Sequence, residues 1–404
     1  MKINQISILI LLLLSFTFIT SCNDDDPDDP LEPMPTGNTV TYELSERAVD
    51  GINGTVTFIE NDDASTTVEI SLNNTPAGGE HPAHIHANTA AEGGPIVITL
   101  GTVDGDTGES SITFSTSDDG TPITYTQLLD FDGHVNVHLS SSELSTIVAQ
   151  GDIGQNDLNG TIKEYDLNSV AVPEISGNIV FAERENGEIL ATISLMNTPE
   201  DGTHPAHIHA NSAADGGGII LSFNPVDGAT GISRTNITQF DDGTPITFDE
   251  LLELDAHVNV HLSESELGTI VAQTDIGENE FTGEEISYDL ATRDVEGISG
   301  VATFAERMNG STLVTIGLTG TPDGGEHPAH IHQNSAEAGG GIVISLEAVD
   351  GTTGISQTDI EVTDNEETIS YEDLLIFDGH INVHLSPDDL TTIVAQGNIG
   401  VNAE

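Results

Sequence analysis

The sequence predicts an all-β chain of three tandem antiparallel Greek-key β-sandwich domains with short helical inserts. Three observations lead to this prediction: an internal repeat, apolar residues that alternate at strand length, and turn residues between those segments. The motif HPAHIH begins at His81, His204 and His327, so each copy starts 123 residues after the one before. A period of this length suits a self-sufficient domain and is too long for a solenoid repeat of about 20 to 50 residues.

The elements of one copy follow from local patterns. Apolar residues alternate or run at strand length in residues 54–60, 66–72 and 94–100, with Gly, Asn, Asp and Pro between them. Two capping-box patterns per copy predict two short helices, the first before Leu-Leu and the second before LxTIVAQ. The first patterns start at Thr124, Thr247 and Ser370, and the second at Ser140, Ser263 and Ser386. Gly151 and Gly397 stand where the second helix would end.

The repeat and the N-terminal composition set the predicted boundaries. Residues 1–21 have a positive start and an apolar run of signal-peptide length, and Ile19-Thr20-Ser21-Cys22 resembles a lipobox, which predicts lipidation at Cys22. Residues 22–39 are rich in Asp and Pro and predict an extended tether. The three repeats are assigned to residues 40–161, 162–284 and 285–404. The segment LNGTIKEYDL at the first of these junctions is expected to start a domain rather than end one.

Charge excludes several classes of partner. The 404 residues include 68 Asp and Glu against 7 Lys and Arg, a formal net charge of −61. Such a surface repels the phosphate backbone of nucleic acids and anionic bilayers, so the expected membrane contact is the lipid anchor alone. The expected location is the outer membrane or cell surface, with metal ions and extracellular proteins as partners. One Cys allows neither an internal disulfide nor a cysteine zinc site, so a metal would be held by His and carboxylates.

The histidines carry the unusual chemistry. All 15 lie in HPAHIH or in HxNVH, and 50 residues separate His84 from His134, with the same gap in the other copies. In a strand, His84 and His86 share one face, and His134, Asn136 and His138 share a face opposite Val135 and Val137. The valines are expected to face the core. The candidate metal ligands are His81, His84, His86, His134, His138, His204, His207, His209, His257, His261, His327, His330, His332, His380 and His384.

If the two motif strands are neighbours, four imidazoles converge, with His81 as a fifth. Imidazole nitrogens suit Zn(II) and Cu(II), which gives up to three ions per chain. Carboxylates and amides beside the ligands can orient a bound imidazole; the candidates are Asp132, Asn136, Asp255, Asn259, Asp378 and Asn382. The alternative is a polar ladder of His, Asn and Asp that only stabilises the strands. Asp104 to Gly108 slightly resembles a calcium loop, but Asp106 is not repeated, which favours a turn.

The strand HIHANTAAEGGPIVITL, followed about 50 residues on by HVNVHL, resembles the chordin-type (CHRD) domain. The resemblance covers residues 40–404 three times and implies a β-sandwich of an extracellular or bacterial surface protein. The matching positions in the first copy are His84, His86, Asn136 and His138. His134 replaces an aromatic residue of the family, and the usual final strand is altered here.

These patterns favour a binding protein over an enzyme. The H-x-H strand is similar to the copper ligands of copper/zinc superoxide dismutase, but no basic residue recurs in all three copies to attract superoxide. No Gly-x-Ser-x-Gly elbow or catalytic Cys is present in the sequence. The prediction is a lipid-anchored surface protein that binds Zn(II) or Cu(II), and the competing hypothesis is a structural or adhesive spacer.

Overall fold

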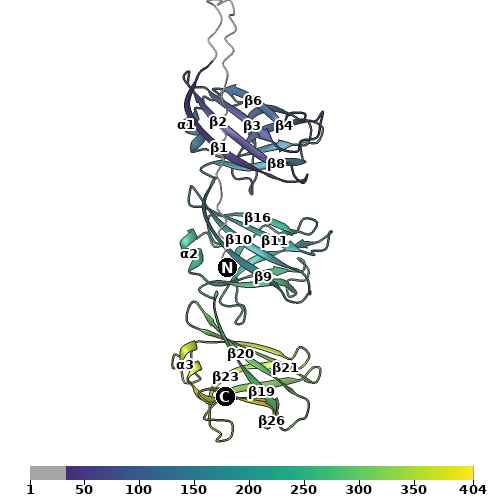
Figure 1. The fold of residues 1–404 in the computed structure, drawn as a ribbon, viewed down its shortest axis with the longest axis vertical. Coiled ribbons are helices and arrows are strands. Elements are labelled where there is room, and N and C mark those ends of the chain that lie inside the picture. The colour runs from purple at the N-terminus through teal and green to yellow at the C-terminus, as the bar shows by residue number, and fades with distance from the viewer. Residues whose placement is uncertain (1–32, 404) are drawn as a thin grey trace, which may run out of the picture.

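The computed structural model describes residues 33–403, so the predicted signal peptide, Cys22 and most of the predicted tether lie outside the described residues. The described residues are mostly β, which confirms the all-β prediction. Their strands form three sheets, one in each of three units that follow one another along the long axis (Figure 1). Within residues 33–403, none of the helices has the length and apolar character needed to cross a membrane.

The strands and helices are the following. Unit 1 contains β1 (Pro35–Glu46), β2 (Gly54–Asn61), β3 (Thr66–Leu72), β4 (Glu80–Ala87), β5 (Ile96–Asp104), β6 (Glu109–Phe114), α1 (Tyr125–Leu129), β7 (Asp132–His138) and β8 (Ile147–Gly154). Unit 2 contains β9 (Leu158–Ser169), β10 (Ser176–Arg184), β11 (Ile189–Met196), β12 (Thr203–His204), β13 (Ala206–Ala210), β14 (Ile219–Ser222), β15 (Val226–Asp227), β16 (Ile232–Ile237), α2 (Phe248–Leu252), β17 (Asp255–His261) and β18 (Ile270–Gly277). Unit 3 contains β19 (Phe281–Thr292), β20 (Ser299–Arg307), β21 (Thr312–Thr319), β22 (Glu326–Gln333), β23 (Ile342–Asp350), β24 (Ile355–Ile360), α3 (Tyr371–Leu375), β25 (Asp378–Ser386) and β26 (Asp389–Gly400).

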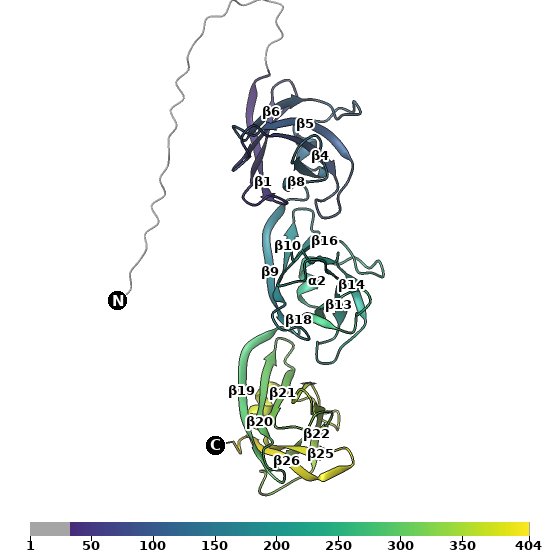
Figure 2. The same cartoon turned by 90° about the vertical axis from the view of Figure 1, so that its right-hand side faces the viewer.

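Each sheet is antiparallel and curls back on itself. In unit 1 the strand order is β5-β4-β7-β8-β1-β2-β3-β6, and the end strands β5 and β6 contact each other. The two halves of this sheet join where the end of β1 pairs with β8, at Ser45 and Glu46. In unit 2 the strands equivalent to β4 and β5 are each interrupted, and their pieces occupy both ends of the strand order. In units 1 and 3 the end strands of the sheet contact each other, β5 with β6 and β23 with β24, so these two sheets are nearly barrel-shaped (Figure 2).

Each unit encloses its own hydrophobic core. Val135 and Val137 are fully buried in the core of unit 1, as their alternation in the sequence predicts. The first strand of each unit begins at Pro35, Leu158 or Phe281, a few residues before the predicted boundaries at 40, 162 and 285. Residues 35–39 of the predicted tether therefore belong to β1. The strand β9, predicted to start a domain, pairs with β10 and β18 of unit 2.

One helix per unit is confirmed and the other prediction is wrong. The helices α1, α2 and α3 begin after Thr124, Thr247 and Ser370, and each has a complete capping box. The segment after Ser140 forms tight turns and then strand β8, in which Val148 and Ala149 are fully buried. Because these β-branched and small residues are buried in a strand that pairs with β7, the segment forms a strand and not the predicted helix. Gly151 is therefore a strand residue, at which a Cβ would lie 2.0 Å from the Glu43 carbonyl oxygen.

Candidate metal centres

The two histidine motifs lie on neighbouring antiparallel strands. Strand β4 pairs with β7 so that His84 is opposite Asn136 and His86 is opposite His134. The same register recurs between β13 and β17 and between β22 and β25. Because side chains alternate across a sheet, the histidines of this register share the face opposite Val135 and Val137. The sequence could predict each strand, but only the fold brings the two motifs together.

Three imidazoles converge in each unit. In unit 1 they are His84, His86 and His138, and one nitrogen of each lies within 4.8 Å of the others. We call such a group a histidine triad; the other two consist of His207, His209 and His261, and of His330, His332 and His384. An ion with bonds of 2.0–2.1 Å in tetrahedral geometry needs nitrogens about 3.4 Å apart, so to bind it the three nitrogens would have to come at most about 1.4 Å closer together.

Backbone carbonyls fix the tautomer of one histidine in each triad. Nδ1 of His86 is 2.9 Å from the carbonyl oxygen of Gly94, and a carbonyl only accepts, so Nδ1 carries the proton. His209 and His332 repeat this bond with Gly217 and Gly340. The Nε2 atoms of these three histidines are buried and have no hydrogen-bond partner. A neutral imidazole with a free lone pair is the form in which histidine binds a metal.

The other two members of the triad also offer free nitrogens. Nδ1 of His84 and Nε2 of His138 are buried without a hydrogen-bond partner. In unit 2, Nδ1 of His261 donates to the carbonyl oxygen of Leu267 at 2.6 Å, which leaves its Nε2 free. Buried polar atoms without partners are rare in folded proteins. The equivalent nitrogens of units 2 and 3 are also buried without a partner. The one exception is His384, where the unpartnered atom is Nδ1 instead of Nε2.

His134 and its equivalents lie beside the triads. The ring of His134 stacks on His86, with centroids 5.1 Å apart and an interplanar angle of 18°. Its Nδ1 donates to the carbonyl oxygen of Asn88 at 2.8 Å. His257 and His380 have the same stacking and the same bond to Asn211 and Asn334. These histidines support the triad and are not among its three convergent nitrogens.

His81 and its equivalents lie away from the triads. Its side chain is fully buried, and its Nδ1 donates to the backbone oxygen of His138 at 3.2 Å. Its Nε2 faces the turn at Gly79. His204 and His327 make the same contacts. The expected convergence of four imidazoles with a fifth therefore narrows to three. His81 stands three residues before His84 in β4, so it faces the core together with Ala83 and Ile85, on the opposite side of the strand from the triad.

Of the polar residues predicted to orient the ligands, the aspartates bind asparagines, and one asparagine contacts a histidine. Asp132 accepts from Nδ2 of Asn156 at 2.9 Å, and Asp255 and Asp378 accept in the same way from Asn279 and Asn402. Among the described residues these carboxylates make no hydrogen bond to a histidine. Asn136 accepts from Gln150 at 2.8 Å. Asn259 contacts Nε2 of His257 at 3.3 Å, and Asn382 accepts from Gln396 at 2.7 Å.

Burial lowers the pKa of several triad histidines and so favours their neutral form. Desolvation, followed by the neighbouring His138 and His86, lowers the pKa of His84 below its usual 6.5. Desolvation also lowers the pKa of His138, and the carbonyl of Leu144 acts in the opposite direction. In unit 2 the pKa of His207 falls to about 4, mainly because of desolvation and then because of His261 and His209. Neutral rings at ordinary pH are ready to bind a cation without first releasing a proton.

Sequence reasoning missed two residues that support the site. Gln150 binds Asn136, and Asp152 accepts from the backbone nitrogen of Ala90 at 2.6 Å, in the loop whose carbonyls hold His86 and His134. Gln273 and Gln396 repeat the first contact, and Asp275 and Asn398 repeat the second. The signal was that Gln recurs at the step of 123, followed two positions later by Asp, Asp and Asn, next to the residue at which the second helix was predicted to end.

Comparison with models of protein families, with curated proteins and with solved structures finds no match to this chain. Function must therefore be argued from the geometry and chemistry of the triads.

Proposed function

We propose that this chain is a lipid-anchored surface protein whose three units each bind one Zn(II) or Cu(II) ion through a histidine triad. The observation that carries the proposal is the recurrence of three convergent imidazoles, with free ring nitrogens, in every unit. A purely structural ladder of hydrogen-bonded histidines would leave these nitrogens paired. Nε2 of His81 is also buried without a partner but stands alone, so it is the convergence of three such nitrogens that favours a metal over the structural or adhesive spacer.

The donor set suits an ion that keeps one coordination position open. Three imidazole nitrogens with no thiolate and no carboxylate among them are typical of Zn(II) and Cu(II) sites. At a nitrogen site of given geometry Cu(II) binds more tightly than Zn(II), so we expect that order of affinity. The open position can take water or a donor from another molecule. An open coordination position supports capture or storage of the ion and its transfer to extracellular proteins.

The remaining parts of the proposal rest on the sequence. Lipidation at Cys22 and placement at the outer membrane or cell surface follow from the resemblance to a lipobox and from the predicted tether. The chordin-type assignment of the three units and the Greek-key sandwich description are proposals as well. They are supported by the HIH and NVH motifs on paired strands and by the non-sequential strand order.

Metal content and calorimetry test the function. Residues 23–404, purified without chelator, should retain Zn or Cu or take up three ions per chain after chelator treatment, with Cu(II) bound more tightly than Zn(II). Replacing His330 and His332 by Ala should reduce the stoichiometry from three to two. His380→Asn in the same unit is the matched control: it lies beside the triad, so three ions should still bind, the third up to about tenfold more weakly.

Two outcomes would contradict the proposal. The first is that the purified chain contains no metal and releases no heat on titration with either ion. The histidines would then have only a structural role. The second is that the copper-loaded chain dismutates superoxide rapidly. The function would then be redox catalysis, which the H-x-H strand supports by its similarity to the copper ligands of superoxide dismutase.

A further inference from the structure

Two buried arginines lie at equivalent positions where consecutive units meet. Arg184 ends β10 and Arg307 ends β20, and at most 1% of either residue is exposed. At the equivalent position of unit 1, which follows no other unit in the described chain, the residue is Asn61. With so few positive charges in the chain, the burial of two at the joints requires a specific explanation.

Each arginine bridges two units. Nη1 of Arg184 lies 2.8 Å from Oδ2 of Asp152 in β8 of unit 1, and it also donates to the backbone oxygen of Asn156. Its Nε donates to Asn236 of its own unit at 2.9 Å. Nη1 of Arg307 lies 2.8 Å from Asp275 of unit 2 and 2.5 Å from the backbone oxygen of Asn279, and its Nε lies 3.0 Å from Asp359.

Backbone hydrogen bonds complete each joint. The turn after β10 docks on the turn after β8, since Glu185 and Asn186 donate to the carbonyl oxygens of Asp157 and Gln155 at 2.9 and 3.0 Å. Met308 and Asn309 repeat these bonds to Glu280 and Glu278 at 2.8 and 2.9 Å. Figure 2 shows β9 and β19 running along the row next to these joints. A buried ion pair is costly to break on one side only, because the remaining charge is left unpaired.

The aspartate of each joint also holds the loop of the histidine triad. Oδ1 of Asp152 accepts from the backbone nitrogen of Ala90, and Oδ2 binds Arg184. The loop of Ala90 supplies the Asn88 and Gly94 carbonyls that fix His134 and His86. Asp275 makes the same pair of contacts, to Ala213 and Arg307.

Unit 3 shows the loop contact without the joint. Its residue at the position of Asp152 is Asn398, whose Oδ1 accepts from Ala336 at 2.8 Å. No arginine of the described residues contacts Asn398. An amide keeps the loop bond but carries no charge that would need a partner. The acid is used where an arginine arrives, and the amide where none does.

We propose that Arg184 and Arg307 are positioning residues that clamp consecutive units together and, through Asp152 and Asp275, brace the loop of the histidine triad in the preceding unit. The second half of this proposal rests on the proposed metal binding. The triads of units 1 and 2 are then each supported by the unit that follows, whereas within residues 33–403 the loop of the third triad is held only by residues of unit 3.

Substitutions at Asp152 separate the two roles. In residues 23–404, Asp152→Asn copies the residue of unit 3: it should loosen the first joint and broaden the distribution of maximum dimensions in small-angle scattering. Because the amide can still accept from Ala90, zinc affinity at the first triad should change by less than about threefold. Asp152→Ala removes both contacts and should in addition lower that affinity about tenfold, a typical effect of losing a group that orients a ligand.

Asn398→Ala is the matched control. It removes the loop contact where no joint exists, so zinc affinity at the third triad should fall about tenfold while the scattering stays as in the parent chain. Affinities are measured one triad at a time, with the other two removed by paired His→Ala substitutions. Unchanged scattering in Asp152→Asn overturns the clamp, and unchanged affinity in Asp152→Ala overturns the bracing. If the parent chain binds no zinc, the proposed function fails, and the scattering alone still decides the clamp.

Discussion

The chemistry of single residues here depends on which ring nitrogen each histidine leaves free. The Gly94 carbonyl accepts a hydrogen bond from Nδ1 of His86, and the Asn88 carbonyl accepts one from Nδ1 of His134, so the loop between them sets both tautomers. His86 then points its free Nε2 at the triad, whereas His134 stacks behind it. Identical side chains in one motif thus have different roles, decided by the backbone atoms that they contact.

The lowered pKa values predict how the stability of the metal-free chain depends on pH. His207 has a pKa of about 4 in the folded state against an ordinary value of 6.5. Between these values the unfolded chain binds a proton that the folded chain does not, so the free energy of unfolding falls as the pH drops from about 6.5 towards 4. Above pH 6.5 this contribution is constant. Urea denaturation at pH 7 and pH 5 measures the difference.

A variant isolates the contribution of His207. His207→Gln cannot titrate, so its loss of stability between pH 7 and pH 5 should be smaller than that of the parent chain. Saturation with Zn(II) should oppose the loss in the parent chain, because the ion competes with protons for the ring nitrogens. An equal pH dependence in parent and variant would show that His207 titrates normally in the folded state.

At the scale of elements, close contact between strands decides where glycine is required. Gly54, Gly177 and Gly300 occupy the same position in the three units. A Cβ at any of them would lie 1.9 Å from a carbonyl oxygen of the next strand, for Gly177 that of Ser194. Such a distance is far below van der Waals contact, so the strands β10 and β11 would have to separate.

We therefore expect Gly177→Ala to destabilise unit 2 by about 1–3 kcal/mol, as overpacking typically does. The matched control is Gly268→Ala in the same unit, where an added Cβ meets nothing within 4 Å; the change there should stay within about 0.5 kcal/mol. Denaturant unfolding of the full chain, followed by circular dichroism, compares the two. Equal effects would mean that β10 and β11 adjust without cost.

The wrong helix prediction also belongs to the scale of elements. Ser140-x-x-Glu143 before an apolar run matches a capping box, and the pattern alone does not distinguish a turn before a strand from a helix start. The partner decides: Val137 pairs with Ala149, and Leu139 donates to the carbonyl oxygen of Thr146 at 2.8 Å. Thr124-x-x-Gln127 forms its helix because the following Leu128 packs into the core without a strand to pair with.

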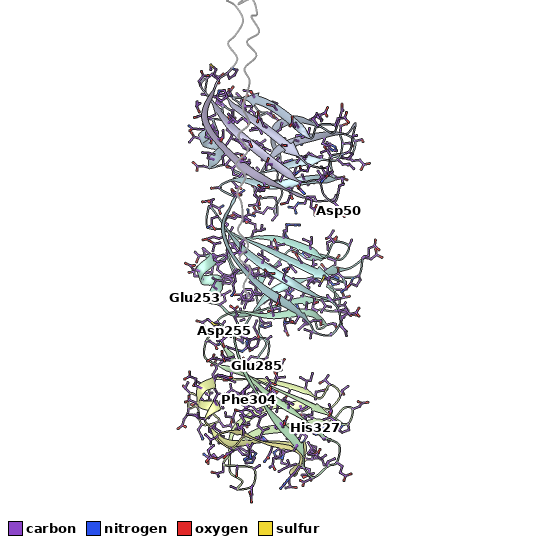
Figure 3. All side chains as sticks on the ribbon, viewed as in Figure 1. Asp50, Glu253, Asp255, Glu285, Phe304 and His327 are labelled. Carbon is purple, nitrogen blue, oxygen red and sulfur yellow. The ribbon has the colours of Figure 1, made fainter. Side chains whose placement is uncertain are left out.

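At the scale of the whole molecule, charge acts on all three triads together. The chain carries a formal net charge of −61, most of it in the three units that form a row (Figure 1). Acidic side chains occur along the row, with Asp255 at the end of unit 2 that faces unit 3 (Figure 3). A field of this sign concentrates cations near the surface and raises their rate of association.

The apparent affinity of each triad for Zn(II) should therefore fall as ionic strength rises. The Debye length is about 30 Å at 0.01 M salt and about 10 Å at 0.1 M, so most of the decrease is expected across this range. Sodium nitrate suits the titration because nitrate complexes zinc only weakly, and sucrose at equal osmolality serves as the uncharged control. An affinity that does not change with salt would mean that the net charge does not assist binding.

Local patterns and the repeat were enough to predict the strands near residues 54–60, 66–72 and 94–100, one capped helix per unit, the burial of Val135 and Val137, and the strands on which the histidines lie. These follow from periodicity and spacing, which are properties of neighbouring residues. The tertiary structure decided which histidines meet: pairing of β4 with β7 brings His84, His86 and His138 together, while His81 faces the core on the other side of β4. It also decided that Arg184 binds Asp152 across a joint. Contacts between distant segments depend on strand order and register, because those set which side chains face each other, and no local pattern records either one.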